Sequence, residues 1–245
     1  MIKQNRKFYL LSMASLAVLS LSACQTTNSS SQSMSKIDAA MEQAANDAKA
    51  QGKTEESLSM LESIYKRNSN DEMAATKYAA ALRHAGYFKR ASLILTPFAA
   101  AEGQDNAAVL TEYASIQSAM GNYIAAETAA KQAVLADPTS GQAYHVLGVA
   151  LDAQGHHEQA KVAFEKGLDN WEGDPSPILN NMGLNLAALG FIDEAIEVLR
   201  RAMATAPNRT EIERNLRIVS ALQYQAPSTA NDVKPPVPGS KPHNS

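Results

Sequence analysis

The sequence contains one cysteine, at position 24 of 245 residues. A single thiol cannot form an internal disulfide, and it cannot supply a zinc site that needs several thiolates. Aromatic residues are also scarce, at 6%, whereas 45% of the residues are hydrophobic and alanine recurs throughout. Such a composition is typical of closely packed helices rather than of a β-sandwich. The sequence therefore predicts an all-α fold, with enough residues for one large domain or two small ones.

The segment before the cysteine has the features of a secretory signal peptide. Lys3, Arg6 and Lys7 precede an uncharged apolar run over 8–23, which is too short for a comfortable transmembrane helix. The following "LSAC" (21–24) resembles the lipobox of bacterial lipoproteins, which are cut before the cysteine and acylated on it. We predict a signal peptide over 1–23 and a covalent acyl and diacylglycerol lipid on Cys24, including palmitate, with no other cofactor. A buried or reactive free cysteine is the alternative.

The residue after the cysteine and the net charge bear on localisation and partners. In Gram-negative lipoproteins an aspartate at this position usually means retention in the inner membrane, so Gln25 predicts the outer membrane, facing the periplasm. Two or more acyl chains anchor a protein stably, whereas one binds reversibly. Removal of residues 1–23 leaves 19 basic and 25 acidic residues, a formal net charge of −6. A body of that sign has no general attraction for nucleic acid, so we expect no such partner.

Two polar segments flank the central part of the chain. Residues 24–37 are small, polar and almost uncharged, which predicts a lipidated flexible tether. Residues 226–245 hold five of the ten prolines and few large apolar residues, so this tail is predicted to be disordered. It is either a polyproline-like spacer or a docking peptide for a partner.

The region between these segments is repetitive. Similar six-residue stretches begin at Gly52, Gly86, Gly121, Gly155 and Gly190, at intervals of 34 or 35 residues. A period near 34 is typical of a tetratricopeptide array, in which each repeat is a helix-turn-helix hairpin. We predict a right-handed superhelix over 38–225, an unrelated helical bundle being the alternative. Its parts are five hairpins at 38–71, 72–105, 107–140, 141–174 and 176–209, and a capping helix at 210–225.

Particular positions of the repeat explain this choice physically. Small residues at the eighth position, such as Gly148 and Gly183, let the two helices of a hairpin approach closely. The glycine at the fifteenth position permits the backbone conformation that ends the first helix. The third repeat departs from the pattern at its eleventh position, where Gln117 replaces a large apolar residue.

Binding is better supported than catalysis. No catalytic constellation is present, and the adjacent His156 and His157 would point in different directions on a helix, so we predict neither an enzyme nor a small-molecule substrate. In this architecture the first helix of each repeat lines a concave groove. Asn180 and Asn181 lie where a peptide backbone could be bound, although asparagine can also cap or bridge locally. The predicted groove residues are Lys77, Arg83, Thr111, Glu112, Gln142, His145, Asp152, Asn180, Asn181 and Leu184.

Three stretches resemble a particular family. "YHVLGVALDAQGHHEQAKVAFEKGL" (144–168), "PSPILNNMGLNLAALGFIDEAIEVLRRA" (175–202) and "RNLRIVSALQ" (214–223) are similar to TadD, the tetratricopeptide lipoprotein of tight-adherence (Flp) pilus assembly. The resemblance covers roughly residues 70–225 and is best from 140 onward. It implies a scaffold at the outer membrane that binds protein partners of a pilus or secretion machine, such as a secretin or a pilus assembly component. The alternatives are a pilotin-like lipoprotein of a type IV pilus, a general envelope scaffold and, in another class, a peptidoglycan-acting enzyme.

Overall fold

The computed structural model describes the backbone of residues 26–225 and the side chains of residues 36–223. Within these residues the chain forms eleven α-helices and no strand. Their bounds are α1 (Thr26–Ala50), α2 (Thr54–Arg67), α3 (Glu72–His84), α4 (Phe88–Ala99), α5 (Ala107–Ala119), α6 (Tyr123–Ala136), α7 (Gly141–Asp152), α8 (His157–Asp169), α9 (Ser176–Ala188), α10 (Ile192–Thr205) and α11 (Thr210–Gln225).

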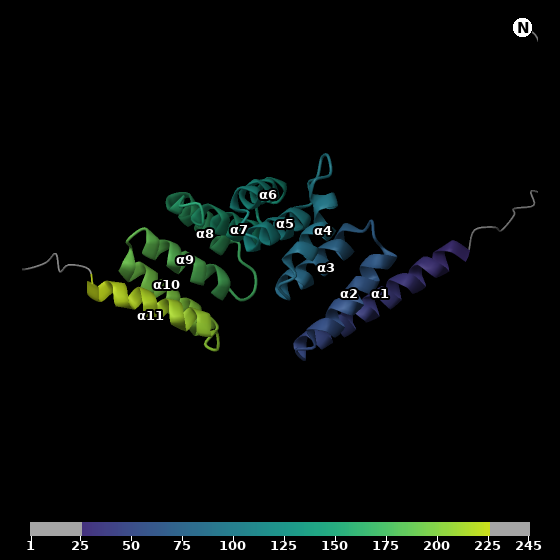
Figure 1. Ribbon diagram of the computed structural model, residues 1–245, viewed down its shortest axis with the longest axis horizontal. Coiled ribbons are helices and arrows are strands. Elements are labelled where there is room, and N and C mark those ends of the chain that lie inside the picture. The colour runs from purple at the N-terminus through teal and green to yellow at the C-terminus, as the bar shows by residue number, and fades with distance from the viewer. Residues whose placement is uncertain (1–25, 226–245) are drawn as a thin grey trace, which may run out of the picture.

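Consecutive helices pack in pairs. The pairs α1–α2, α3–α4, α5–α6, α7–α8 and α9–α10 form five hairpins that follow one another along a curved array, and α11 covers the last of them (Figure 1). From the second repeat onward, successive first helices also contact one another: α3 contacts α5, α5 contacts α7, and α7 contacts α9. The predicted all-α fold of five stacked hairpins and a closing helix is therefore confirmed.

Glycine fulfils two separate roles that the repeat pattern predicts. Gly86 and Gly190 end the first helices of their hairpins with φ of 82° and 87°, which side chains rarely tolerate. Gly148 lies instead where helices touch: a Cβ added there would stand 2.6 Å from the ring of Phe164. At Gly183 an added Cβ would lie 2.7 Å from Cγ of Leu199. Both contacts are possible only because glycine has no side chain, and this allows α7–α8 and α9–α10 to pack closely.

The polar exception at position 117 is accommodated by a second polar residue. Gln117 is buried between repeats, and its Oε1 accepts a hydrogen bond of 2.9 Å from Nδ2 of Asn122. Its Nε2 lies 3.4 Å from Oγ of Ser92. A buried amide is tolerated when its donors and acceptors are paired, which explains the departure from the usual apolar residue.

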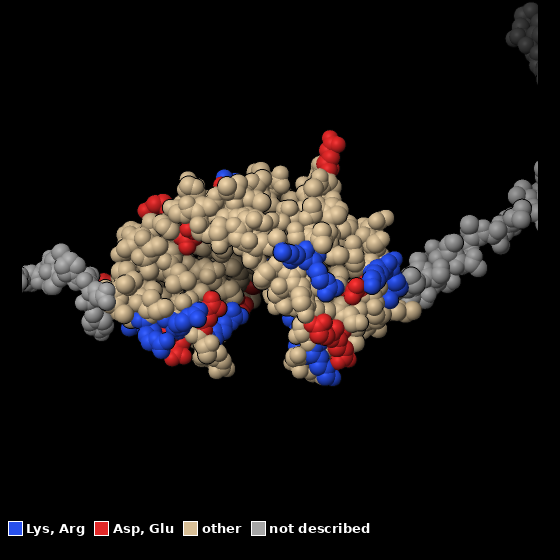
Figure 2. All heavy atoms as spheres, viewed as in Figure 1, with Lys and Arg blue, Asp and Glu red and all other residues tan. Residues whose placement is uncertain are grey.

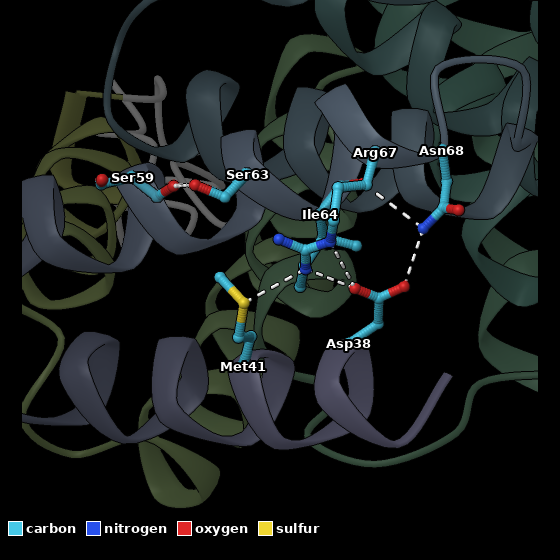
Figure 3. Close-up of polar contacts among 7 residues, drawn as sticks. All are labelled: Asp38, Met41, Ser59, Ser63, Ile64, Arg67 and Asn68. Atoms are coloured by element: carbon cyan, nitrogen blue, oxygen red, sulfur yellow. Dashed lines mark hydrogen bonds and ion pairs between the residues drawn. The ribbon is translucent and has the colours of Figure 1, made fainter. Parts of the chain in front are cut away.

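The first helix is longer than the sequence suggested. Residues 24–37 were expected to be a flexible tether, but the structure places Thr26 onward in α1, so the tether prediction is wrong for this part. No glycine or proline interrupts residues 26–50, so the helix can continue back from its packed C-terminal half. That half is tied to α2, because Nε of Arg67 and Nδ2 of Asn68 donate to the carboxylate of Asp38 at 3.0 and 2.8 Å (Figure 3).

Several predictions lie outside the described residues. These are the signal peptide at 1–23, the lipid on Cys24 and the tail at 226–245. Among residues 26–225, no helix combines the length and the apolar character that a membrane crossing requires.

Candidate functional site

A large groove lies on the concave side of the array. It has a volume of about 820 Å³ and is lined by residues of α3, α5, α7 and α9 and by the connections before α7 and α9. Figure 2 shows a deep indentation between the N-terminal and C-terminal repeats. The lining residues used below are Arg83, Thr111, Glu112, Ser118, Asp137, Gln142, His145, Val149, Trp171, Pro177 and Asn181.

The structure brings six of the predicted groove residues together here. They come from four first helices of successive repeats, α3, α5, α7 and α9, and are Arg83, Thr111, Glu112, Gln142, His145 and Asn181. The other four lie elsewhere: Lys77 pairs with Glu42 of α1 at 2.6 Å, and Leu184 and Asp152 line a smaller pocket beside the groove. Asn180 lines neither of these pockets.

An ion pair joins α3 to α5 at one end of the groove. Nε and Nη2 of Arg83 donate to the two carboxylate oxygens of Glu112 at 2.7 and 3.1 Å. Burial raises the pKa of Glu112, against the opposing effect of Arg83. Both groups are therefore largely removed from water and already paired with each other, which makes the pair a bridge between repeats rather than two free charges.

A chain of side-chain hydrogen bonds crosses the opposite end of the groove. Asn215 of α11 donates to Oδ1 of Asn180 at 2.9 Å, and Asn180 donates to Oδ1 of Asn181 at 3.3 Å. Nδ2 of Asn181 lies 2.8 Å from Nε2 of His145. Each asparagine donates to the next residue in the order Asn215, Asn180, Asn181, His145. Nε2 of His145 is therefore the last acceptor, which requires a neutral imidazole. We call these four residues, in α7, α9 and α11, the polar ladder.

The polar ladder corrects the expectation for Asn180. This residue was predicted to face a bound peptide, but it is 5% exposed and both ends of its amide are bonded within the protein. Asn181 is the member that reaches the groove, and Asn180 holds its amide in place. Sequence reasoning missed Asn215, although His145, Asn180 and Asn215 recur at intervals of 35 residues.

Asp152 also forms hydrogen bonds within the fold. Its Oδ1 lies 2.7 Å from Nδ1 of His157 and accepts a hydrogen bond of 2.7 Å from Nδ2 of Asn185. Asn185 donates to the backbone oxygen of His157 as well, at 2.9 Å. This cluster ties α7, α8 and α9 together, so Oδ1 of Asp152 is engaged inside the fold.

A residue that sequence reasoning missed forms one wall of the groove. Trp171 lies in the connection between α8 and α9, where the sequence "NWEGD" delays the usual proline. Its Nε1 donates to the backbone oxygen of Asp174 at 2.8 Å, and its ring meets that of His145 edge-on at 5.4 Å between centroids. Asp174 in turn accepts from the backbone N–H of Ser176 at 2.9 Å. The longer connection therefore fixes an aromatic wall.

Burial of His145 predicts a pH dependence of stability. Desolvation lowers its pKa from 6.5 to about 4, so its stabilising contribution is complete above pH 6.5 and is lost as the pH falls toward 4. Between pH 7 and 4.5 we expect the native chain to lose about 2 kcal/mol more unfolding free energy than His145→Gln does, since one pKa unit corresponds to about 1.4 kcal/mol.

Urea unfolding at both pH values measures this difference. The comparison between variants is needed because Glu112 acts in the opposite direction: its raised pKa makes the folded state take up a proton more readily as the pH falls. Equal pH dependence in the two proteins would mean that His145 is not held neutral by the fold.

Comparisons with known proteins agree with the fold. Residues 141–170, which span α7 and α8, match the tetratricopeptide repeat model. The structure of TTC0263, a thermophilic TPR protein of Thermus thermophilus, is similar with a TM-score of 0.65 and 16% identity, over 75% of this chain and 99% of that one. MamA (41-end) of Desulfovibrio magneticus RS-1 is similar with a TM-score of 0.52 and 19% identity, over 70% and 96%.

A further similar structure is that of the APC/C hetero-tetramer Cut9–Hcn1, with a TM-score of 0.69 and 15% identity, over 80% of this chain and 39% of that one. No curated protein sequence matches the chain. The fold is that of a tetratricopeptide-repeat protein. In residues 26–225 no group of three or more His, Cys, Asp or Glu side chains could hold a metal ion.

Proposed function

We propose that the protein is a scaffold for protein–protein interaction, and that it holds a protein partner in the concave groove. The observation that carries this proposal is the convergence of Arg83, Thr111, Gln142, His145 and Asn181, from four stacked first helices, on one groove. A surface built from several repeats suits an extended macromolecular ligand better than a small substrate. The similar fold in Cut9–Hcn1 belongs to a protein that assembles with another.

We further propose that this scaffold is anchored by lipid on Cys24 in the outer membrane, facing the periplasm, and serves assembly of a Flp-type pilus. Support comes from the sequence: the "LSAC" lipobox, Gln25 after it, and the stretches at 144–168, 175–202 and 214–223 that resemble TadD. Anchoring would raise the local concentration of the groove near membrane-embedded partners without adding any contact. The partner would then be a secretin or another pilus assembly component.

Photo-crosslinking in intact cells tests the groove and its partner together. A photoreactive residue at Gln142, which is exposed and lines the groove, should crosslink to a secretin or pilus assembly component that mass spectrometry identifies. The matched control is Leu135 of α6, which is 81% exposed and does not line the groove. A partner captured equally well at both positions would contradict recognition by the groove.

The same experiment separates the alternatives. Crosslinks to a type IV pilus secretin alone would favour a pilotin-like lipoprotein, and crosslinks to unrelated envelope proteins would favour a general scaffold. Hydrolysis of peptidoglycan by the purified chain would replace the scaffold proposal by an enzymatic one.

A further inference from the structure

The groove offers few free charges to a ligand. The two ends of the Arg83–Glu112 pair satisfy each other, and His145 accepts from Asn181, which requires its neutral form. Asp137 is the remaining acidic group of the lining, and its Oδ1 already accepts from the backbone N–H and the hydroxyl of Thr139 at 2.9 and 2.7 Å. A charged ligand would lose hydration on entering the groove and would find no unpaired counter-charge there except that of Asp137, whose hydrogen bonds come from neutral groups of Thr139.

The groove does offer a neutral polar group with unused hydrogen-bonding capacity. Oγ1 of Thr111 and Oγ of Ser118 have no hydrogen-bond partner, but both atoms are shielded from solvent, so neither is open to a ligand as the side chains stand. Asn181 uses one N–H toward His145 and accepts one bond from Asn180, which leaves one donor and one acceptor on its amide. Peptide groups carry one donor and one acceptor each, so an extended backbone matches this amide.

An apolar wall stands beside this polar group. Trp171 has its indole N–H bonded to Asp174, so the rest of the ring is available for apolar contact. Val149 and Pro177 line the same groove. The connection that carries Trp171 is held at its far end by Asp174, which binds the N-terminus of α9 and forms an ion pair of 3.2 Å with Arg209. A fixed aromatic wall of this kind favours a large apolar side chain as an anchor.

We propose that the groove selects an uncharged, extended polypeptide segment that places one large apolar side chain against Trp171 and hydrogen-bonds through its backbone to Asn181. This inference rests on the proposed protein-binding function and specifies the chemistry of the partner.

Calorimetric titration of the full chain in mild detergent tests the inference. Three pools of end-blocked peptides of equal length are compared, each with one central leucine or phenylalanine: an uncharged pool, an acidic pool and a basic pool. We expect the uncharged pool to bind at least about tenfold more tightly than either charged pool. Its affinity should stay constant between about 0.1 and 1 M salt, where the screening length falls to about 3 Å. Trp171 is the single tryptophan of the chain, so its fluorescence reports occupancy of the groove independently.

Variants localise the binding. Trp171→Ala should weaken the uncharged pool about tenfold, Trp171→Phe should retain most of the affinity, and Leu135→Ala on α6 should have no effect. Tighter binding of the acidic or the basic pool, with a change in Trp171 fluorescence, would overturn the inference and leave the groove as the recognition site. Failure of all three pools to bind would overturn both the inference and recognition of peptides by the groove.

Discussion

Phe164→Ala is expected to lower the free energy of unfolding by about 3–5 kcal/mol, the usual cost of removing a buried aromatic ring. Phe164 is completely buried in α8 and is the largest of the fully buried side chains in the described residues. Its ring packs against Gly148 of α7 and lies in the same cluster as Ile178 of α9. One side chain therefore holds the fourth hairpin together and joins it to the fifth.

The fourth hairpin lies between two others in the array, and this position increases the destabilisation that Phe164→Ala causes. The stability of stacked repeats is approximately the sum of the repeats and of the contacts between neighbours, so damage in the fourth repeat also weakens the contacts on both its sides. Equilibrium unfolding in urea, followed by circular dichroism, measures the loss. Val162→Ala on the same helix is the matched control, because Val162 is 51% exposed and should change the unfolding free energy by less than about 0.5 kcal/mol.

A second substitution tests whether the contact with Gly148 is the cause. Gly148→Ala alone should destabilise the protein, because the new methyl group would stand 2.6 Å from the Phe164 ring. In the Phe164→Ala background the same substitution adds a methyl group beside an empty space and removes a helical glycine, so it should stabilise. Additive effects in the double-mutant cycle would contradict direct packing of the ring on this glycine.

The glycines of the repeats show what the sequence could predict about the fold. The small residue at the eighth position of a repeat implied close approach of the paired helices, and the structure confirms it at Gly148 and Gly183. The glycine at the fifteenth position implied a left-handed backbone, which Gly86 and Gly190 adopt. Both inferences succeed because the interactions are local to one hairpin and recur with a fixed period.

The candidate site was less predictable, because long-range contacts decide which polar side chains are free. Asn180 and Asn181 are adjacent and of the same type, yet Asn215 from α11 buries and satisfies Asn180 while Asn181 reaches the groove. Asp152 is held in the same way by Asn185, 33 residues later in the chain. Position within a repeat places a residue on a face of the helix, but it does not say which partner the neighbouring repeat provides.

Trp171 could not be predicted for a different reason. The repeat pattern assigns inward positions only to the first helix of each hairpin, and Trp171 lies in a connection that is longer than the pattern allows. The extra length was visible as a delayed proline at Pro175. Only the hydrogen bond to Asp174 and the edge-on contact with His145 show that the extra residues turn toward the groove.

Replacement of the single cysteine is expected to have the largest effect on localisation. If Cys24 carries the acyl chains, Cys24→Ser removes every one of them, and the protein should lose palmitate labelling completely. Each buried methylene contributes about 0.8 kcal/mol to membrane binding, so loss of several chains removes the lipid anchor. Any membrane association that remains would come from the apolar run over 8–23, which the variant keeps if it is not cleaved. Signal-peptide cleavage before residue 24 should fail in the same variant, which an increase in mass on electrophoresis would show.

Gln25→Asp provides the matched control for this prediction. It leaves Cys24 and its acylation intact, so palmitate labelling and cleavage should be unchanged, while sucrose-gradient fractionation should find the protein in the inner rather than the outer membrane. The two variants separate anchoring from sorting, because the first removes the lipid and the second changes only its destination. Palmitate labelling that persists in Cys24→Ser would place the lipid elsewhere and would remove the basis for an anchored scaffold. Acylated protein that stays in the outer membrane in Gln25→Asp would contradict sorting by the residue after the cysteine.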